Sequence, residues 1–291
     1  GLAAGMVALL LGFVVFRSVT APLNKLTRAA QAVAVGDLTQ RVDIHTGDEI
    51  AELGAAFNAM ATNLERAERV RREMTADIAH ELRTPLSVIQ GNLEAFLDGV
   101  YPADAEHIQP ALDQTQLLAR LVEDLRTLAL AEAGQLSLDL QSTDAAELTR
   151  RVSASLKARA ADKRITLAVD APSTLSPVKA DDQRIAQVLT NLLGNALRHT
   201  PQDGHITIRL QEEKQAVFVR VTDDGPGISA EDLPHVFDRF YRADKSRSRE
   251  GGGSGLGLAI ARSIIASHGG RIWAESEIGQ GTTIVFTLPI G

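Results

Sequence analysis

The hydrophobic pattern divides the chain into an apolar start, a helical middle and a C-terminal part in which helices and strands alternate. Residues 2–16 are almost wholly apolar and are followed by Arg17. From there to about residue 136, apolar positions recur at steps of three and four, the spacing of amphipathic helices. From residue 137 onward, runs with a period of two alternate with helical runs, which is typical of an α/β domain. The 291 residues suggest about two domains by length alone, and the pattern divides them further.

The apolar start is interpreted as the cytoplasmic end of a truncated transmembrane helix. A bilayer is crossed by about 20 apolar residues, and residues 2–16 fall short of that number. A signal peptide is disfavoured, because no charged segment precedes the run and no clear cleavage-like site ends it. Arg17, Lys25 and Arg28 follow before any acidic residue, as the positive-inside rule predicts for a cytoplasmic flank. A buried core helix is the alternative.

Residues 17–69 are expected to form two short amphipathic helices joined by an extended connector. Pro22 suits the first turn of the first helix, and Gly36 breaks its pattern. The second helix starts near residues 48–49, with these apolar positions facing inward: Ile50, Leu53, Phe57, Met60 and Leu64. Each helix is too short and too one-sided to be stable alone, so two copies of the unit are expected to form a four-helix bundle. A plain dimeric coiled coil is the alternative.

A third helix is predicted over residues 74–93. Its apolar stripe recurs at steps of four, four, three and four, and consists of Ile78, Leu82, Leu86, Ile89 and Leu93. His80 lies outside this stripe, and Thr84 follows it by one helical turn, so the two share a face. Pro85 lacks the N–H that would bond the Glu81 carbonyl, and a bend is therefore expected there.

The chemistry that this helix suggests is nucleophilic. A carboxylate that holds the proton of one imidazole nitrogen fixes the tautomer and raises the nucleophilicity of the other nitrogen. Glu81 is placed to do this for His80. Taken alone, however, His80 is better explained as a solvated surface histidine. The segments in the C-terminal half of the chain are what favour a nucleophile instead.

The helix that starts near residues 48–49 continues into the His80 helix without a turn residue, so a rotation or shift at one end can reach the other. The His80 helix is expected to end near residues 98–99. A return helix follows from about Asp104, with these core positions: Ile108, Leu112, Leu118, Leu121, Val122, Leu125 and Leu128. A hairpin with an exposed apolar stripe again predicts dimerisation into a four-helix bundle.

The C-terminal part is predicted to be an α/β sandwich with a mixed sheet and helices on one face. The expected elements, in chain order, are a strand at 138–140, a helix at 144–163, a strand at 165–169, a helix at 181–199, a hairpin of 205–210 with 216–222, a helix at 255–268 and a hairpin of 271–275 with 282–288. Alternation and helical spacing decide between strand and helix at each step.

Composition narrows the possible functions. The net charge is −7 and no basic stripe with interleaved aromatic residues occurs, so nucleic-acid binding is not indicated. The chain has no cysteines, which excludes disulfides, thiolate zinc sites and a cysteine nucleophile. Aromatic residues are only 4% of the chain, so the cores are expected to be mainly aliphatic.

Two C-terminal segments carry polar groups suited to a nucleotide. Asn191 and Asn195 lie one turn apart on a predicted helix, and an amide oxygen is a hard ligand that suits Mg²⁺. Asp223 ends a predicted strand, where its carboxylate can accept a hydrogen bond from an exocyclic amine, and Gly225 and Gly227 let backbone approach a ligand closely. The simpler explanations are two solvated asparagines and an ordinary turn.

Two further segments lie near the last helix. The glycine-rich run 251–258 opens that helix and leaves N–H groups for phosphate, with help from the helix dipole. A Rossmann fingerprint is rejected, because no strand leads directly into this run and it comes late in its domain. Residues 237–242 precede a polar loop at 243–250, which contains Arg and Lys and is interpreted as a lid beside the phosphates.

These four segments, in this order, resemble the N, G1, F and G2 boxes of the GHKL ATP-binding superfamily, and residues 279–282 resemble its further glycine box. Residues 17–69 resemble a HAMP domain through Pro22, Gly36 with Leu38, and Glu49. With the His-Glu-Leu-Arg-Thr-Pro motif at 80–85, the whole chain resembles a bacterial sensor histidine kinase of two-component signalling. The resemblance implies four parts: the end of a transmembrane helix at 1–16, a HAMP-like relay at 17–69, a dimerisation and phosphotransfer hairpin at 70–136 and an ATP-binding domain at 137–291.

The resemblance also implies roles on the hairpin. The histidine that matches His80 attacks the γ-phosphate of ATP and becomes phosphohistidine, and the acidic residue that matches Glu81 orients it and serves as base. The phosphoryl group then passes to an aspartate of a response regulator. The threonine that matches Thr84 positions a water that hydrolyses the regulator's phospho-aspartate, which implies a phosphatase activity as well.

Further roles are implied in the ATP-binding domain. Asn195 matches the Mg²⁺ ligand, with Asn191 beside it, and Asp223 matches the carboxylate that binds the adenine amine. The pocket is shaped by Gly225 and Gly227, and the phosphate side is formed by Gly253, Gly255 and Gly257. Arg198 and Arg239 match basic positions that can face the phosphates. His199 stands where many relatives carry Tyr. A stacking role against adenine is expected for it, although His at this position departs from the family pattern.

The implied protein is a homodimer anchored in the bacterial inner (cytoplasmic) membrane, with these domains on the cytoplasmic side and a response regulator receiver domain as partner. A GHKL-type ATPase that uses water as acceptor would share the nucleotide boxes, but it would not need the His80 segment or two dimerising hairpins. A non-catalytic dimeric signalling scaffold is a second competing interpretation, and a family member that acts mainly as a phosphatase is a third. Phosphorylation within one protomer and across the dimer are both open.

Overall fold

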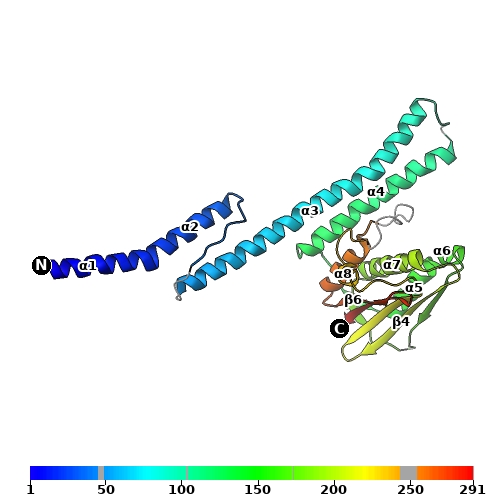
Figure 1. The fold of residues 1–291 in the computed structure, drawn as a ribbon. Coiled ribbons are helices and arrows are strands. Elements are labelled where there is room, and N and C mark those ends of the chain that lie inside the picture. Colours follow the sequence, from blue (N-terminus) through cyan, green and yellow to red (C-terminus); the bar gives the residue numbers. More distant parts are fainter. Residues whose placement is uncertain (45–48, 103, 173, 243–253, 291) are drawn as a thin grey trace. The chain divides into compact units, whose positions relative to one another are not determined.

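The computed structural model describes residues 1–44, 49–102, 104–172, 174–242 and 254–290 (Figure 1). It divides into two compact units, Gly1–His80 and Glu81–Gly291. The long helix α3 (Glu49–Leu97) contributes residues to both units.

The first unit begins with α1 (Leu2–Val15), a helix of small and apolar residues. A five-residue π-helix, η1 (Phe16–Thr20), joins it to α2 (Ala21–Ala34). The combined run Leu2–Ala34 contains an 18-residue window of mean hydropathy 2.2, and it is the one helix in the described part of the chain that is long and apolar enough to cross a membrane. The helix expected to start at Pro22 therefore starts at Ala21, and no break separates it from the apolar helix before it. Pro22 has no N–H for the preceding turn, and the helix widens there instead.

A small core joins α2 to the first part of α3, and its buried members are Leu26, Ala29, Val42, Phe57 and Ala61. Asn58 fixes the connector to α3, because its side chain accepts a hydrogen bond from the Val42 N–H at 2.9 Å and donates to the Val42 carbonyl at 2.8 Å. Three residues expected to face inward stay exposed in a single chain: Leu53, Met60 and Leu64. The apolar face of α3 is thus wider than one partner helix covers.

The second unit begins with a hairpin formed by the end of α3 and by α4 (Ala105–Glu132). Asp104 caps α4, since its carboxylate accepts a hydrogen bond from the His107 backbone N–H at 3.1 Å. On α4, Leu121 and Leu128 are buried and join the core of the domain that follows. The large apolar residues that stay exposed on the hairpin include Leu86, Val88, Leu93, Leu97, Ile108, Leu112 and Val122. A single chain therefore covers only part of the apolar stripe expected on the return helix.

The main sheet of the α/β domain contains five strands in the spatial order β2 (Thr166–Asp170), β4 (His205–Glu213), β5 (Ala216–Asp223), β7 (Gly281–Pro289) and β6 (Ile272–Glu277). The β2–β4 pair is parallel and the other pairs are antiparallel, which confirms the predicted mixed sheet. One face is apolar because alternate residues of each strand point to it, as Val217, Val219 and Val221 do on β5.

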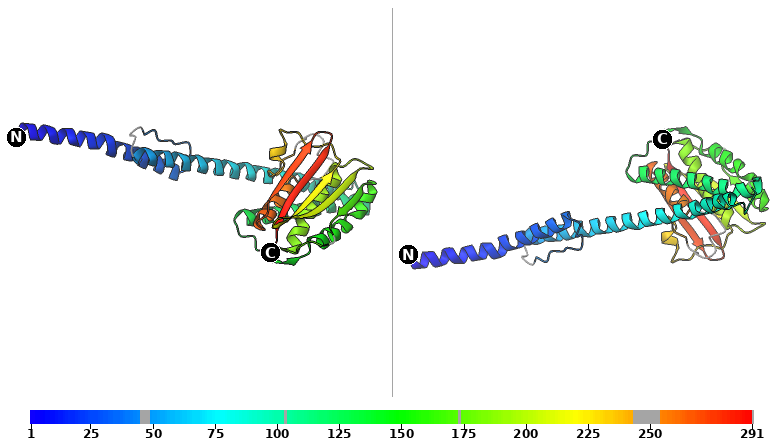
Figure 2. Two further views of the ribbon diagram at one scale, coloured as in Figure 1. Left: turned by 90° about the horizontal axis from the view of Figure 1, so that it is seen from below. Right: turned by 90° about the horizontal axis from the view of Figure 1, so that it is seen from above.

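Helices cover the apolar face of this sheet, as Figures 1 and 2 show. They are α5 (Ala145–Ser155), α6 (Lys157–Asp162), α7 (Asp182–His199) and α8 (Gly257–Ser267), and a 3-10 turn η2 (Leu233–His235) precedes α8. The α7 and α8 helices pack on each other and supply much of the core, including Leu189, Leu193, Ile260 and Ile264. The prediction of long helices followed by an α/β domain is confirmed.

Two local predictions are wrong. Residues 138–140 are not a strand; β1 (Gln141–Thr143) follows them and pairs antiparallel with β3 (Val178–Ala180), a strand that was not predicted. The position of β1 is set by this distant partner, which local alternation does not reveal. The single helix expected over 144–163 breaks at Leu156, which lies between α5 and α6 and is buried in the core.

Candidate functional site

The helix α3 presents His80 and Thr84 on an exposed face, one turn apart. Glu81 beside them is partly buried, and Pro85 is buried while the helix continues through it. An imidazole on such a face can be reached by another molecule, which a histidine nucleophile needs.

The helix α7 positions the two asparagines. Its first turn is capped by Asp181, whose carboxylate accepts hydrogen bonds from the N–H groups of Gln183 at 3.0 Å and Arg184 at 3.1 Å. The apolar face of α7 is buried, so Asn191 and Asn195 stand at its partly buried border. The Asn191 side chain donates to the Gly257 carbonyl at 3.2 Å, which joins α7 to the start of α8.

Asp223 ends β5 and is only 9% exposed. Burial raises the pKa of its carboxyl above the usual range, and hydrogen bonds from the N–H groups of Gly225 and Thr282 oppose that rise. The Gly225 N–H lies 3.0 Å from Asp223 Oδ1. A buried carboxylate held by backbone amides is a fixed acceptor for a donor group on a ligand.

The turn after Asp223 is packed too tightly for side chains. Gly227 has φ +73°, and a Cβ there would lie 2.1 Å from the Glu277 carbonyl oxygen. A Cβ on Gly225 would lie 2.7 Å from Asp223 Oδ1 and 3.1 Å from the His199 carbonyl oxygen. Only glycine therefore lets this turn approach both the β6–β7 hairpin and the end of α7.

Arg198 and His199 form the last turn of α7. Partial burial lowers the pKa of both side chains, and neighbouring positive charges lower it further. Each side chain nevertheless reaches solvent. Lys163 donates to the carbonyls of Leu197 at 2.9 Å and Arg198 at 3.2 Å, which satisfies the end of the helix. The neutral imidazole is thus favoured at His199, and a neutral ring can stack on a base.

The segment before α8 holds Arg239, which forms an ion pair with Glu132 at the end of α4. Phe240 has φ +57°, and its N–H donates to the Gly255 carbonyl at 3.0 Å. A Cβ on Gly255 would lie 2.8 Å from the Phe240 backbone, so glycine is required there. The structure thus places Gly257 at the start of α8 beside Asn191, and Gly255 just before that helix against Phe240. Gly253 and the loop 243–250, predicted as phosphate-side glycine and lid, lie outside the described residues.

The structure brings several of the predicted nucleotide residues together along α7. Asn191 contacts Gly257, and the end of α7 at His199 contacts the turn at Gly225. Two participants were not singled out from the sequence: Ser276 and Thr282, which meet across β6 and β7 and hold the Asp223 turn. In the sequence they are ordinary polar strand residues, and only the glycine box at 279–282 pointed toward them.

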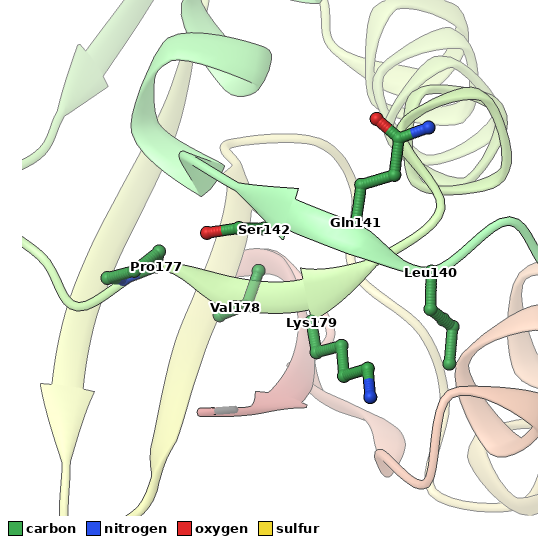
Figure 3. Close-up of a pocket in the computed structure, with 6 residues that line it drawn as sticks. All are labelled: Leu140, Gln141, Ser142, Pro177, Val178 and Lys179. Atoms are coloured by element: carbon green, nitrogen blue, oxygen red, sulfur yellow. The ribbon is translucent and has the colours of Figure 1, made fainter.

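One cavity of the domain lies away from these residues. A pocket of about 290 Å³ opens beside the β1–β3 pair and is lined by Leu140, Gln141, Ser142, Pro177, Val178 and Lys179, as Figure 3 shows. None of these six residues is among those predicted to bind a nucleotide, and Lys179 is the one ionisable group among them. The chemistry at Asp223 and Asn195, not this cavity, therefore locates the candidate site.

Three family models match successive parts of the chain. Residues 14–66 match the HAMP domain, residues 70–134 match the His Kinase A (phospho-acceptor) domain, and residues 180–291 match the Histidine kinase-, DNA gyrase B-, and HSP90-like ATPase domain. The third match implies ATP binding by the domain that contains Asp223 and Asn195.

Individual proteins match over most of the chain. The signal transduction histidine-protein kinase BaeS of Escherichia coli (strain K12) is 36% identical over 287 residues, which is 99% of this chain and 61% of BaeS. The structure of the Acinetobacter baumannii histidine kinase AdeS is similar with a TM-score of 0.63 and 32% identity, covering 73% of this chain and 98% of that one. The histidine kinase ThkA, solved in complex with the response regulator protein TrrA, is similar with a TM-score of 0.61 and 28% identity, covering 78% of this chain and 64% of that one.

The chain spans 61% of BaeS, so part of that curated relative has no counterpart here. Within the shared part, the order of HAMP, phospho-acceptor and ATPase domains agrees with the helices, the hairpin and the α/β domain of the structure. The AdeS structure is matched over nearly its whole length at 32% identity. The resemblance drawn from the sequence is confirmed, and the chain belongs to the family of sensor histidine kinases.

Proposed function

We propose that the α/β domain binds ATP and that the chain uses it to phosphorylate His80, from which the phosphoryl group passes to an aspartate of a response regulator. The observation that carries this proposal is the pairing, in one chain, of an exposed histidine helix with a buried, amide-held carboxylate at Asp223. We place the domain boundaries after residues 16, 69 and 136.

Asp223 is the proposed acceptor for the exocyclic amine of adenine. Its carboxylate is fixed by backbone N–H groups, and Gly225 and Gly227 leave room for a flat base. The neutral ring of His199 is proposed to stack on that base. Gly255 and Gly257 at the start of α8 offer backbone N–H groups to the phosphates, together with Gly253, and Arg198 and Arg239 supply positive charge.

The residues present fit a magnesium ion. Asn195 is partly buried, offers a hard amide oxygen, and its side chain forms no hydrogen bond to another of the described residues. Asn191 beside it is held by Gly257. When bound, Mg²⁺ would offset charge on the phosphate oxygens, and the work of the protein is then to hold the nucleotide and present the histidine.

At His80, an imidazole nitrogen forms a bond to the γ-phosphorus while the bond from that phosphorus to the β–γ bridging oxygen breaks, and ADP leaves. Glu81 is proposed to hold the proton on the other ring nitrogen, which keeps the attacking lone pair available. The phosphoryl group then moves from nitrogen to a carboxylate oxygen of the regulator, which restores the imidazole. The ThkA structure, solved with a response regulator, supports a partner of this kind.

Thr84 supports a second activity. Its hydroxyl shares the exposed face of His80, where it can orient a water toward a bound phospho-aspartate. We propose that the chain also dephosphorylates its regulator. The expected result for Thr84→Ala is unchanged labelling of His80 but slower loss of phosphate from a phosphorylated receiver domain that accepts label from the chain.

We further propose that the protein acts as a homodimer in the bacterial cytoplasmic membrane. The exposed apolar residues of the hairpin and the phospho-acceptor domain match support dimerisation. The apolar run at residues 2–16, which begins the long helix Leu2–Ala34, supports the membrane anchor. Arg17, Lys25 and Arg28 follow that run and support a cytoplasmic position for the remaining domains.

The proposed function is tested by label transfer from γ-labelled ATP with Mg²⁺. The intact chain should form an adduct that is acid-labile and base-stable, as a phosphoramidate is. His80→Gln and Asn195→Ala should both abolish it, whereas His107→Gln, a control on the same hairpin, should label normally. Label that persists in His80→Gln would overturn the assigned nucleophile, and nucleotide hydrolysis without any protein label would favour a GHKL-type ATPase.

A further inference from the structure

The hydroxyl of Ser276 on β6 joins two segments that lie far apart in the sequence. Its Oγ accepts a hydrogen bond from the Ile228 N–H at 2.9 Å, at the end of the turn that follows Asp223. It also donates to the Gly281 carbonyl at 2.6 Å and lies 3.0 Å from the Thr282 hydroxyl, both at the start of β7. One side chain thus contacts the Asp223 turn and the glycine box near the C-terminus.

Proton counting fixes the direction of each hydrogen bond. A serine hydroxyl has one proton to donate and two lone pairs to accept with. The proton is used by Gly281 and one lone pair by Ile228, so the Thr282 hydroxyl must donate to the other lone pair. Every hydrogen-bonding position of Ser276 is therefore filled. An alanine there would leave the Ile228 N–H and the Gly281 carbonyl without this partner.

The segments that Ser276 joins are also in direct backbone contact. The Gly279 N–H donates to the Pro226 carbonyl at 2.8 Å. A Cβ on Gly281 would lie 2.0 Å from the Asp223 carbonyl oxygen, and a Cβ on Gly227 would lie 2.1 Å from the Glu277 carbonyl oxygen. Each of these two contacts has a glycine on one side, and a glycine has no side chain to hold the segments together. The Ser276 hydroxyl supplies a specific link at the same junction.

The junction bears directly on the Asp223 carboxylate. Thr282 is the partner of Asp223 in the β5–β7 pairing, and its backbone N–H helps to hold the carboxylate in place. Gly225 on the turn holds the carboxylate from the other segment at 3.0 Å. The orientation of Asp223 therefore depends on how the turn and the start of β7 are placed relative to each other.

We propose that Ser276 is a positioning residue for the nucleotide site: its hydroxyl fastens the turn at 225–228 to the start of β7 and thereby fixes the Asp223 carboxylate for adenine. This inference rests on the proposed function, since it assumes that Asp223 binds the base. Ser276 touches neither the nucleotide nor the reacting atoms. Its loss is expected to weaken binding of ATP without slowing phosphoryl transfer once ATP is bound.

The same two strand ends provide a matched control. Thr222 and Thr283 stand immediately beside Asp223 and Thr282 in sequence, and their hydroxyls lie 2.9 Å apart across β5 and β7. Because neighbouring residues of a strand point to opposite faces, this pair lies on the other side of the sheet. Thr283→Ala therefore removes a cross-strand hydroxyl contact at the same place without touching the Asp223 turn.

The experiment compares Ser276→Ala, Ser276→Thr and Thr283→Ala with the intact chain. ATP affinity is measured by titration, and the initial rate of His80 labelling is measured across ATP concentrations. Ser276→Ala is expected to raise the Kd and KM for ATP about five- to tenfold while the rate at saturation stays the same. Ser276→Thr, which keeps the hydroxyl, should restore most of the affinity, and Thr283→Ala should bind as the intact chain does.

A pH series separates positioning from general loosening of the sheet. If the Thr282 N–H is no longer held against Asp223, the pKa of that carboxyl rises further. As the pH is lowered, the carboxylate of Ser276→Ala should then be protonated earlier, so its ATP binding should begin to weaken at a higher pH than that of the intact chain. Equal affinity in Ser276→Ala and the intact chain, or an equal loss in Thr283→Ala, would overturn the inference while leaving the proposed function standing. Failure of the intact chain itself to bind ATP would overturn the proposed function and this inference with it.

Discussion

The α/β domain and the helical part of the chain bury their apolar residues in different ways. In the domain, large side chains such as Leu193, Ile260 and Phe286 are completely covered by the same chain. On the helices, Leu53, Leu93 and Leu112 remain about half exposed, at 52%, 52% and 47%. The core of the domain, which includes Leu121 and Leu128 of α4, is completed within one chain, whereas the outer face of the helical hairpin needs a second surface.

This difference separates the two halves of the proposed chemistry. Asp223 and the asparagines of α7 stand on elements whose positions are fixed by the core of one chain. His80 stands on a helix whose apolar face is only partly covered. The proposed nucleotide site thus lies where one chain completes its own core, and the proposed phospho-acceptor His80 lies where an apolar surface is left uncovered by the chain itself.

The largest effect is expected where the domain leaves no space at all. Gly281→Ala places a Cβ 2.0 Å from the Asp223 carbonyl oxygen at φ +85°, so the free energy of unfolding should fall by about 3 to 5 kcal/mol and ATP binding should be lost. Gly279→Ala is the control, because its φ of +80° is similar but nothing lies within 4 Å. It should cost about 1 kcal/mol. Denaturant unfolding of both variants measures the difference, and equal losses would contradict the close-packing argument.

A core substitution tests the comparison itself. Leu193→Ala removes a fully buried side chain and should lower the free energy of unfolding of the α/β domain by about 2 to 5 kcal/mol. That loss should not depend on protein concentration.

Leu112→Ala on the hairpin should instead change the concentration at which the chain dimerises, with little effect on the unfolding of the α/β domain. Sedimentation across a concentration range, together with thermal unfolding, distinguishes the two behaviours. If Leu112→Ala destabilises the domain as Leu193→Ala does, the contrast between self-covered and partner-covered surfaces is wrong.

A third prediction concerns the loss of folding stability that the buried Asp223 carboxylate causes. Burial raises the pKa of Asp223, so the stability linked to its protonated form is present at low pH and is lost as the pH rises through the raised pKa. Asp223→Asn should therefore make the nucleotide-free domain more stable at neutral pH. The same change should weaken ATP binding about tenfold or more, since the charged acceptor is gone.

Thermal unfolding and ATP titration of Asp223→Asn test both halves of this prediction. Asp224→Asn is the neighbouring comparison, because the Asp224 carboxylate accepts from the His205 N–H at 2.9 Å and its charge is the smallest of the causes that act on the pKa of Asp223. A less stable Asp223→Asn domain would show that the carboxylate contributes to the fold, contrary to the burial argument.

The smallest effect is expected on α4. Burial raises the pKa of Asp124 to about 6. The stabilising contribution of its protonated form is present below the unfolded pKa and is lost as pH rises through about 6. Asp124→Asn does not titrate, so it should become more stable than the intact chain above that pH, by about 1 kcal/mol after allowance for solvent screening. Unfolding at pH 5 and pH 8 measures this, and a difference that does not change with pH would contradict it.

Much of the α/β domain follows from local patterns. The β4–β5 hairpin and the β6–β7 hairpin were predicted because each strand alternates over several residues, and α7 because its apolar residues recur at helical spacing. The β3 strand was missed because three residues, Val178–Ala180, carry too little pattern, and their pairing partner lies far away in sequence.

The candidate site shows the same limit. Asn191, Asn195 and Asp223 could be proposed because their types and spacing suit a nucleotide, and the glycines because a turn needs them. Ser276 could not, since its importance comes from hydrogen bonds to residues 48 positions earlier and five and six positions later. Likewise, the ion pair of Arg239 with Glu132 spans 107 positions, and no local signal predicts it.

The continuous helix α3 has one more consequence, which concerns residue counting. Its 49 residues extend about 73 Å at about 1.5 Å per residue. Each residue inserted between residues 66 and 72 would turn His80 by about 100° about the helix axis relative to the segment before it, whereas seven would restore its azimuth to within about 20°. Activity plotted against insertion length should then rise and fall with the helical period, so the number of residues in this spacer, more than their identity, sets which way the histidine faces.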